Sequence, residues 1–306
     1  MSGVIVAGTD GSAGAAAAVR WAADDASRRG LRVHLVHAVP AGVSGTEEGE
    51  RVLAEAARVA ARYAGASAVT TELAEGRPDE VLRERATGAA EVVVGSHGAG
   101  VAPGTLVGSV PLRVAGHVAG AVVVARCPQA PDSGGMGFDD PYGIAFGDLG
   151  GGQVGRIVVG AGDERAGEAG EGDRALEFAF EQARLHRRPL LVVHARPEHA
   201  TTRRPPGRGP LTGTGAGGRS PEAQTVDVEE WHGEERLAGP RERYPDVTVT
   251  CEVTRCPPVP ALVAASTRAA LLVVGSRGLG PVGSLLLGSV SRSVLHHARC
   301  TVAVVR

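Results

Sequence analysis

The sequence predicts an α/β protein made of two doubly wound, five-stranded parallel sheets that together form a tandem pseudo-dimer. Three observations lead to this prediction. The chain repeats itself, each copy alternates short apolar segments with amphipathic ones, and each copy carries the same glycine pattern after its fourth apolar segment. The length of 306 residues also agrees with two domains of about 150 residues.

The repeat is clearest toward the end of each copy. Val92 to Gly98 corresponds to Leu272 to Gly278, and Gly108 to Val110 corresponds to Gly288 to Val290, both at a spacing of 180 residues. Internal repeats of this kind decide the architecture before local detail does. The second half of the chain is therefore a second copy of the first.

Earlier landmarks lie closer together, which places extra residues inside the second copy. Gly8 pairs with Gly160 at a spacing of 152 residues, and His37 pairs with His194 at 157. The run from Thr201 to Pro221 is rich in Arg, Pro, Gly and Thr, a composition that cannot bury a core. We expect domain 1 at residues 1–127, a linker at 128–154, and domain 2 at 155–306 with a disordered insertion near 199–222.

Strands separated by amphipathic helices predict βαβ units and a parallel sheet. Ligands of such sheets bind beyond the carboxyl ends of the strands, near the point where the strand order reverses. Each expected strand is a short run dominated by Val, Ile, Leu and Ala. In the first copy these runs are about Val4 to Gly8, Val33 to Ala38, Val69 to Leu73, Val92 to Gly95 and Ala121 to Ala125; in the second they are about Ile157 to Ala161, Leu190 to Ala195, Val247 to Val253, Leu271 to Gly275 and Thr301 to Val305.

The fifth strands, with Val122 to Val124 and Val302 to Val305, are apolar and would each lie at a sheet edge. Because an exposed apolar edge invites pairing, two such edges in one chain can cover each other through a pseudo-twofold contact. We expect an internal pseudo-dimer in which these edges run antiparallel and both glycine loops face solvent. A further homodimer of the whole chain and an unknown protein partner remain open.

The glycine pattern consists of Gly-x-x-Gly, nine residues, and then Gly-Ser opening a helix. It describes a loop that returns to a helix N-terminus, where free N–H groups and the positive end of the macrodipole receive an anion. The alternative is that the glycines only make turns and the serine only caps a helix. The residues are Gly95, Gly98, Gly108 and Ser109 in the first copy, and Gly275, Gly278, Gly288 and Ser289 in the second.

Composition excludes several classes of function. All 32 basic residues are arginine, so a Walker A loop and Schiff-base chemistry are excluded, since both need a lysine. Aromatic residues make up 3% and the formal net charge is −2, so nucleic acid is not an expected partner. Four cysteines without a C-x-x-C spacing, no signal peptide and no long apolar run favour the cytoplasm and no membrane contact.

The sequence resembles the universal stress protein family, in which the same spaced glycine motif follows an opening strand that ends in Gly-Val-Asp-Gly-Ser. The first copy has Gly8-Thr9-Asp10-Gly11-Ser12 at this place, and His37-Ala38, Glu75-Gly76-Arg77-Pro78 and His296-His297-Ala298-Arg299-Cys300 are similar too. The resemblance spans nearly all of both copies. It implies a Rossmann-like fold of the adenine nucleotide alpha hydrolase type.

The resemblance also implies bound ATP, ADP or AMP, with or without Mg²⁺. Adenine would lie near Asp10 and Ala38, and ribose and phosphates near the glycine loop, although Asp10 has an alternative role as the N-cap of the first helix. The implied residues are Thr9, Asp10, Gly11, Ser12, Ala38, Val94, Gly95, Ser96, His97, Gly98, Gly108, Ser109 and Val110 in the first copy, and Asp163, Ala195, Gly275, Ser276, Arg277, Gly278, Gly288, Ser289, Val290 and Ser291 in the second.

The second copy departs from the family pattern where the base would be recognised. Gly162 stands at the position of Asp10, and Asp163 follows one residue late. A glycine has no side chain to contact a base edge, whereas the phosphate half of the motif is intact. Nucleotide binding by the second copy is therefore left open.

The sequence supports no catalytic residue and no metal site. His37 and His194 lie at strand ends and imidazole titrates near neutral pH, but no carboxylate pair, nucleophile elbow or metal-ligand spacing accompanies them. We expect a nucleotide-dependent regulatory or signalling module of the stress response. The alternatives are a weak ATPase or phosphotransfer enzyme and a scaffold that binds no nucleotide.

Overall fold

The structure, a computed structural model, describes residues 3–40, 42, 46–98, 107–126, 155–162, 171–195, 233–276 and 287–306. The expected linker at 128–154 and the expected insertion near 199–222 lie outside the described residues, as do Asp163, Arg277 and Gly278.

All ten expected strands are present, with bounds that differ from the expected ones by at most two residues. The first copy consists of β1 (Val4–Gly8), α1 (Ala13–Arg29), β2 (Arg32–Val39), α2 (Thr46–Ala64), the 3₁₀ turn η1 (Ala66–Ala68), β3 (Val69–Glu75), α3 (Pro78–Arg85), β4 (Glu91–Gly95), α4 (Ser109–His117) and β5 (Ala121–Ala125). The second consists of β6 (Arg156–Ala161), α5 (Glu171–His186), β7 (Leu190–Ala195), α6 (Gly233–Arg243), β8 (Val249–Thr254), α7 (Pro258–Ser266), β9 (Ala269–Gly275), α8 (Ser289–His297) and β10 (Thr301–Val305).

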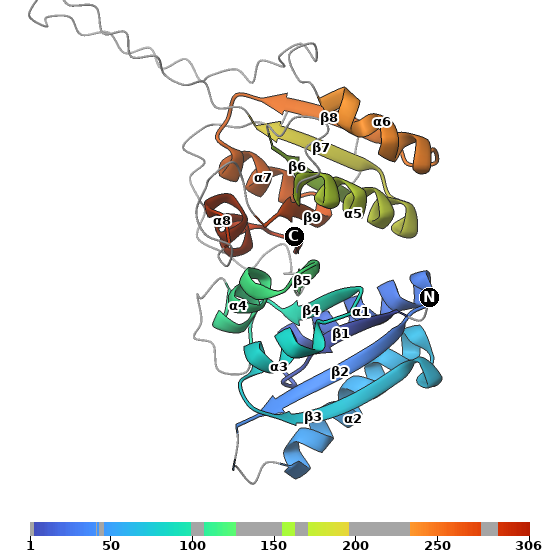
Figure 1. The fold of residues 1–306 in the computed structure, drawn as a ribbon, viewed down its shortest axis with the longest axis vertical. Coiled ribbons are helices and arrows are strands. Elements are labelled where there is room, and N and C mark those ends of the chain that lie inside the picture. Colours follow the sequence, from blue (N-terminus) through green and yellow to red (C-terminus); the bar gives the residue numbers. More distant parts are fainter. Residues whose placement is uncertain are drawn as a thin grey trace, which may run out of the picture.

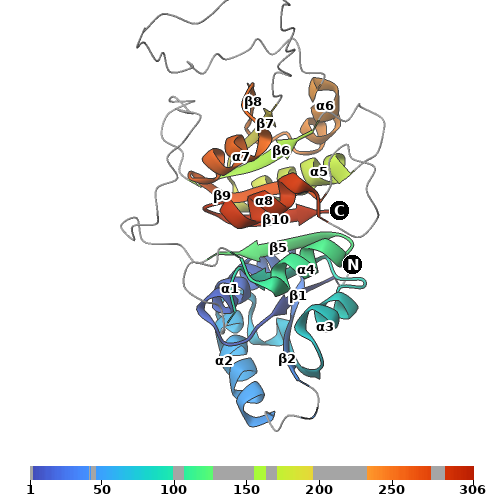
Figure 2. The same ribbon diagram turned by 90° about the vertical axis from the view of Figure 1, so that its left-hand side faces the viewer.

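The ten strands form one continuous sheet in the order β3-β2-β1-β4-β5-β10-β9-β6-β7-β8. Neighbours within a copy are parallel, and β5 pairs with β10 antiparallel, which confirms the expected edge contact (Figure 2). Val123 lies opposite Ala303, its own counterpart in the second copy. The pseudo-twofold axis therefore passes between these two residues, and the two expected sheets are halves of one.

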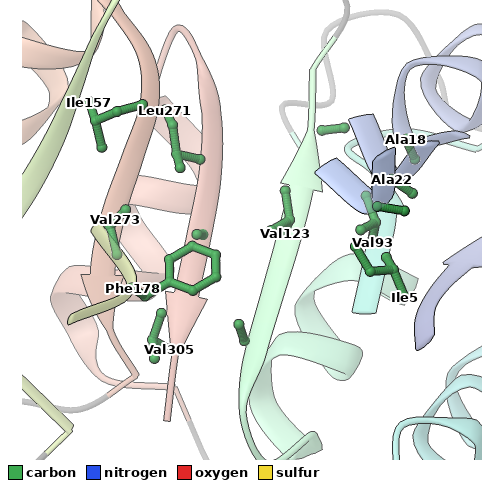
Figure 3. Close-up of a cluster of buried hydrophobic side chains, with 14 of the residues drawn as sticks. Ile5, Ala18, Ala22, Val93, Val123, Ile157, Phe178, Leu271, Val273 and Val305 are labelled. Atoms are coloured by element: carbon green, nitrogen blue, oxygen red, sulfur yellow. The ribbon is translucent and has the colours of Figure 1, made fainter. Parts of the chain in front are cut away.

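Helices cover both faces of the sheet, which explains why its central strands, such as β1, β5, β9 and β10, are almost entirely apolar rather than alternating. Successive residues of a strand belong to different layers of the core. Val93 belongs to the layer that also contains residues of α1, α2, α5 and α6, whereas Val92 and Val94 belong to the layer that contains residues of α3, α4, α7 and α8; Figure 1 labels these helices. Figure 3 shows Val123 on one side of the seam and Val305 on the other, both within the first layer. Each layer is thus one core shared by both copies.

Two arginines cross the seam between the copies. Arg126 and Arg306 follow β5 and β10, and each donates to a backbone carbonyl near the carboxyl end of the other copy's helix. Arg306 Nη2 lies 3.0 Å from Gly116 O on α4, and Arg126 Nη2 donates to Leu295 O on α8. A cation at the carboxyl end of a helix is favourable because it meets the negative end of the macrodipole. The seam is therefore held by side chains as well as by strand pairing.

The first helix of each copy ends in the same backbone turn. Gly30, after α1, has φ 65°, and the next amide donates back to Ala26 O at 2.9 Å. In the second copy Arg187 takes this place with φ 50°, the one positive φ at a non-glycine residue within the described ranges, and Arg188 N donates to Ala183 O at 2.9 Å. A left-handed residue here favours glycine, so Arg187 holds a strained conformation.

Candidate functional site

A cavity of about 240 Å³ opens at the carboxyl ends of β1, β2 and β4, where the strand order of the first copy reverses. Its walls come from the loops that follow β1 and β4 and from the start of α1, α3 and α4. The lining residues are Gly8, Thr9, Asp10, Ala15, Val36, His37, Ala38, Pro78, Leu82, Val94, Gly95, His97, Gly98, Gly108, Ser109, Val110 and Pro111.

Most of the residues implied for the first copy meet at this cavity. Thr9, Asp10, Ala38, Val94, Gly95, His97, Gly98, Gly108, Ser109 and Val110 line it, whereas Gly11, Ser12 and Ser96 do not. Sequence reasoning did not place Gly8, Ala15, Val36, His37, Pro78, Leu82 and Pro111 in the site. The turn that contains Pro78 was part of the family resemblance and could have pointed to that residue.

The loop after β1 fixes the carboxylate of Asp10 at the cavity. Asp10 Oδ1 accepts the N–H of Ser12 at 3.0 Å, and Gly11 between them has φ 79°. Ser12, not Asp10, is the N-cap of α1, because its Oγ accepts the N–H of Ala15 at 3.1 Å. The alternative role of Asp10 as that N-cap is therefore wrong, and its carboxylate belongs to the cavity wall.

Two glycines allow α1 to begin directly against the end of β4. A Cβ on Gly95 would lie 2.5 Å from the carbonyl carbon of Gly14, and a Cβ on Gly14 would lie 2.3 Å from His97 O. Only glycine permits backbones to approach this closely. Gly14 stands in an alanine run that does not mark it, so the sequence analysis missed it.

The loop after β4 is held by its backbone. Ser96 N donates to Ala125 O at 2.9 Å, and Ser96 O accepts the N–H of Gly108 at 2.8 Å. Gly108 is the N-cap of α4 and has no side chain with which to cap the helix, so the alternative role of Ser109 as a cap is wrong. The first amides of α4 therefore lie at the cavity uncapped, as an anion site requires.

The second copy repeats this backbone arrangement. Ser276 N donates to Val305 O and Gly288 N donates to Ser276 O, both at 2.8 Å. Gly288, not Ser289, is the N-cap of α8, which corrects the same alternative here. Gly275 ends β9 as Gly95 ends β4, and Ser289, Val290 and Ser291 open α8 as their counterparts open α4. Ala195 ends β7, whereas its counterpart Ala38 is the last residue but one of β2.

The polar groups of the second copy differ at the place of Asp10. Gly162 O accepts from Arg236 Nη1 at 3.2 Å, and the same guanidinium pairs with Asp173 at 2.9 Å. The side chain of Arg236 is only 3% exposed. A buried cation thus stands beside the end of β6, where the first copy places a carboxylate beside the end of β1.

Among the residues that the structure describes, no three His, Cys, Asp or Glu side chains are placed to hold a metal ion. Within the same residues, no helix combines the length and the apolar character needed to cross a membrane.

Comparisons with known proteins agree with the fold and the repeat. The family model described as the universal stress protein family matches residues 1–126 and 155–306. A universal stress protein of Mycobacterium tuberculosis is 33% identical over 319 residues, which cover 99% of this chain and 96% of the relative.

Solved structures of universal stress proteins share the fold of the whole chain. One from Archaeoglobus fulgidus covers 100% of this chain and 99% of its own length, with a TM-score of 0.64 and 17% identity. One from Pseudomonas aeruginosa, titled a putative universal stress protein, covers 100% and 93%, with a TM-score of 0.61 and 14% identity. With a family match in each half, the chain belongs to the universal stress protein family.

Proposed function

We propose that this chain is a cytoplasmic stress-response protein that binds an adenine nucleotide in the cavity of its first copy and acts as a nucleotide-dependent regulatory module. The single observation that carries the proposal is the cavity itself, which joins a carboxylate, an apolar cleft and an uncapped helix N-terminus at the switch point of a parallel sheet. Cys251, Cys256 and Cys300 are thiols rather than disulfides, as expected in a reducing compartment.

The chemistry of the walls fits an adenine nucleotide. Val36, Leu82 and Val94 supply apolar surface for the faces of a base, and the carboxylate of Asp10 can accept from its exocyclic amine. The amides at the start of α4 can receive phosphate, which is the anion chemistry open to a chain without lysine.

Binding is favoured over catalysis by what surrounds the cavity. Its histidines are engaged by neighbours: His37 Nδ1 lies 2.7 Å from Thr9 O, and His97 Nδ1 lies 2.9 Å from Ser96 Oγ. Hydrolysis or transfer of the terminal phosphate needs a positioned base and groups that stabilise charge on it. A weak ATPase stays the second candidate, and a scaffold without nucleotide the third.

We further propose one nucleotide per chain. The buried guanidinium of Arg236, paired with Asp173, stands beside Gly162 where the first copy places the carboxylate of Asp10, and a cation does not select the exocyclic amine of adenine.

Calorimetric titration with ATP tests both statements. We expect a stoichiometry of one for the wild-type chain, and for Asp10→Ala a loss of about tenfold or more in affinity. Asp246→Ala, which removes an exposed carboxylate at a distant turn, is the matched control and leaves the affinity unchanged. No heat with the wild type would favour the scaffold, a stoichiometry of two would contradict the single site, and phosphate release during the titration would favour the enzyme.

Gly98→Val is a second test, which changes the shape of the cavity while Asp10 keeps its carboxylate. A Cβ at Gly98 would lie 2.6 Å from Asp10 Oδ2, so the branched side chain has to displace the carboxylate and fill the cavity. We expect ATP binding to be abolished in a protein that still shows the wild-type circular dichroism. Unchanged affinity in that folded variant would sink the proposed site.

A further inference from the structure

Helices α1 and α5, which begin the two copies, contact each other beside the pseudo-twofold axis on one face of the sheet. Residues at the 157-residue spacing are counterparts, so Asp25 corresponds to Gln182, Trp21 to Phe178 and Arg29 to His186. If the two copies were identical, the junction would be symmetric and each residue would have the same neighbours as its counterpart. The differences between counterparts therefore show which kind of copy each helix favours as its partner at this junction.

The central pair of the junction is an unlike pair. Asp25 and Gln182 are both fully buried, and Gln182 Nε2 donates to Asp25 Oδ1 at 3.1 Å. A hydrogen bond to a buried carboxylate is stronger than one between neutral groups, because the acceptor is charged and water is excluded.

The flanking contacts keep the twofold pattern with different residues. Trp21 stacks on His186 with ring centroids 5.5 Å apart, and the guanidinium of Arg29 lies 5.7 Å from the centroid of Phe178. Each contact sets an aromatic ring of one copy against a nitrogen-rich side chain of the other. The shape of the junction is thus nearly symmetric, and only its charge is not.

The two fully buried carboxylates of the junction both come from the first copy. Arg29 Nε lies 2.8 Å from Asp25 Oδ2 and Arg29 Nη2 lies 3.7 Å from Glu91 Oε2, so one guanidinium faces both. Burial and the neighbouring Asp25 raise the pKa of Glu91 well above its usual range, and Arg29 opposes this rise. The counterpart of Glu91 in the second copy is Leu271, which carries no charge.

Pairing of like copies would lose this complementarity. Two first copies would bring Asp25 against a second Asp25 with two Glu91 side chains beneath, and like charges at a buried contact cannot all ionise. Two second copies would bring Gln182 against Gln182 and leave no carboxylate to accept its amide.

We propose that this face of α1 selects an unlike partner: it accepts a helix that presents an amide donor at the position of Gln182, and it excludes another carboxylate-bearing first copy. The copies of one chain therefore close on each other rather than pairing with their own kind in another chain. The proposal rests on the junction alone and does not depend on nucleotide binding.

A four-variant cycle tests the proposal in the full chain: the wild type, Asp25→Asn, Gln182→Glu and the double variant. Gln182→Glu sets two carboxylates face to face, and we expect the unfolding equilibrium constant in urea at pH 7.5 to rise about 10- to 100-fold. The double variant exchanges acceptor and donor between the helices, so it recovers most of this loss.

Acid separates charge repulsion from a packing defect. The titratable and charged groups of this junction are Asp25, which contacts residue 182, and Asp24, Arg28 and Arg29 from α1, Glu91 from β4, and Glu181 and His186 from α5 itself. Because protonation removes the repulsion, the loss in Gln182→Glu shrinks as the pH falls from 7.5 to 5, whereas a loss due to packing would persist.

Arg174→Gln is the control for net charge, since it makes the same change of one unit at an exposed site on α5. We expect this control to match the wild type in its unfolding equilibrium constant. Small-angle scattering should report a looser particle for Gln182→Glu than for the double variant. If the double variant is no more stable than Gln182→Glu, or if the effects of the single changes simply add, the proposal is overturned.

Discussion

Glu72 on β3 and Glu252 on β8 occupy the same strand position in the two copies, yet their carboxyl groups are shifted in opposite directions. Arg85 Nη2 at 2.6 Å and His34 Nε2 at 2.8 Å lower the pKa of Glu72 to about 2. Burial raises the pKa of Glu252, and the charge of Arg156 only partly opposes this.

The difference follows from the neighbours rather than from the strand. The second copy has Ala265 and Leu191, both buried, at the positions of Arg85 and His34, so apolar residues replace the cation and the imidazole that pair with Glu72. The backbone frame is repeated closely, while each copy surrounds its polar groups differently. The cavity at Asp10 differs from its counterpart at Gly162 in the same way, because the backbone is repeated and the neighbouring polar groups are not.

The largest effect is expected from disrupting the pairing of β5 with β10, which joins the two copies. Val123→Lys with Val304→Lys buries two ammonium groups in the seam, and we expect a loss of stability of about 5 kcal/mol or more. Small-angle scattering should show separated modules. Thr71→Lys, on an exposed position of β3, is the control. A double variant that matches the wild type in scattering and thermal stability would contradict the role of the seam.

Replacing each glutamate by glutamine should move stability in opposite directions at pH 7, by about 1–2 kcal/mol each. Glu72→Gln destabilises, because a lowered pKa contributes stability that is present above pH 4.5 and lost as the pH falls toward 2. Glu252→Gln stabilises, because a raised pKa means that stability is lost as the pH rises above 4.5. Urea unfolding between pH 3 and 8 measures both, and equal signs would refute the comparison.

A smaller effect is expected where the copies share a backbone turn but differ in residue. Arg187→Gly should stabilise the second copy by about 1 kcal/mol, since it relieves a left-handed arginine. Gly30→Ala should cost a similar amount, and through backbone strain alone, since a Cβ there meets nothing within 4 Å. Thermal denaturation of both variants provides the measurement, and a loss with Arg187→Gly would show that the side chain matters more than its backbone.

The smallest effect concerns the two arginines that cross the seam. Arg306 donates to the carboxyl end of α4, whose other end lies at the cavity, so Arg306→Gln should weaken ATP binding by about two- to fivefold through the helix dipole. Arg126→Gln acts on α8 instead and should leave ATP affinity unchanged. Adenosine, which has no phosphate, should bind all three proteins alike, and an equal loss for adenosine would indicate a shifted helix rather than a dipole effect.

Regular features of the fold could be predicted because local sequence patterns encode them. Apolar runs such as Val122 to Val124 mark strands, and the spacing of 180 residues marks the repeat, so the strand bounds and the antiparallel seam were accessible. The helix caps were not, because Asp10, Ser12 and Ser109 are all residues that can cap and only the path of the loop decides among them.

Features that depend on contact between distant segments could not be predicted. Gly14 is set apart from its alanine neighbours only by the end of β4 pressing against it. Arg236 reaches Gly162 across 74 residues, and Gln182 reaches Asp25 across 157, so neither partner is marked by local pattern. Such contacts follow from the assembled fold and carry most of what distinguishes the two copies.

The pairing of β5 with β10 also means that β5 is synthesised well before its partner strand. Between the end of β5 at Ala125 and the start of β10 at Thr301 lie 175 residues. At about 5–20 residues per second, the ribosome needs roughly 9–35 s to make them. Throughout that interval the first copy can fold but has no partner for its last strand, and a row of valines with free backbone groups stands open to other nascent chains.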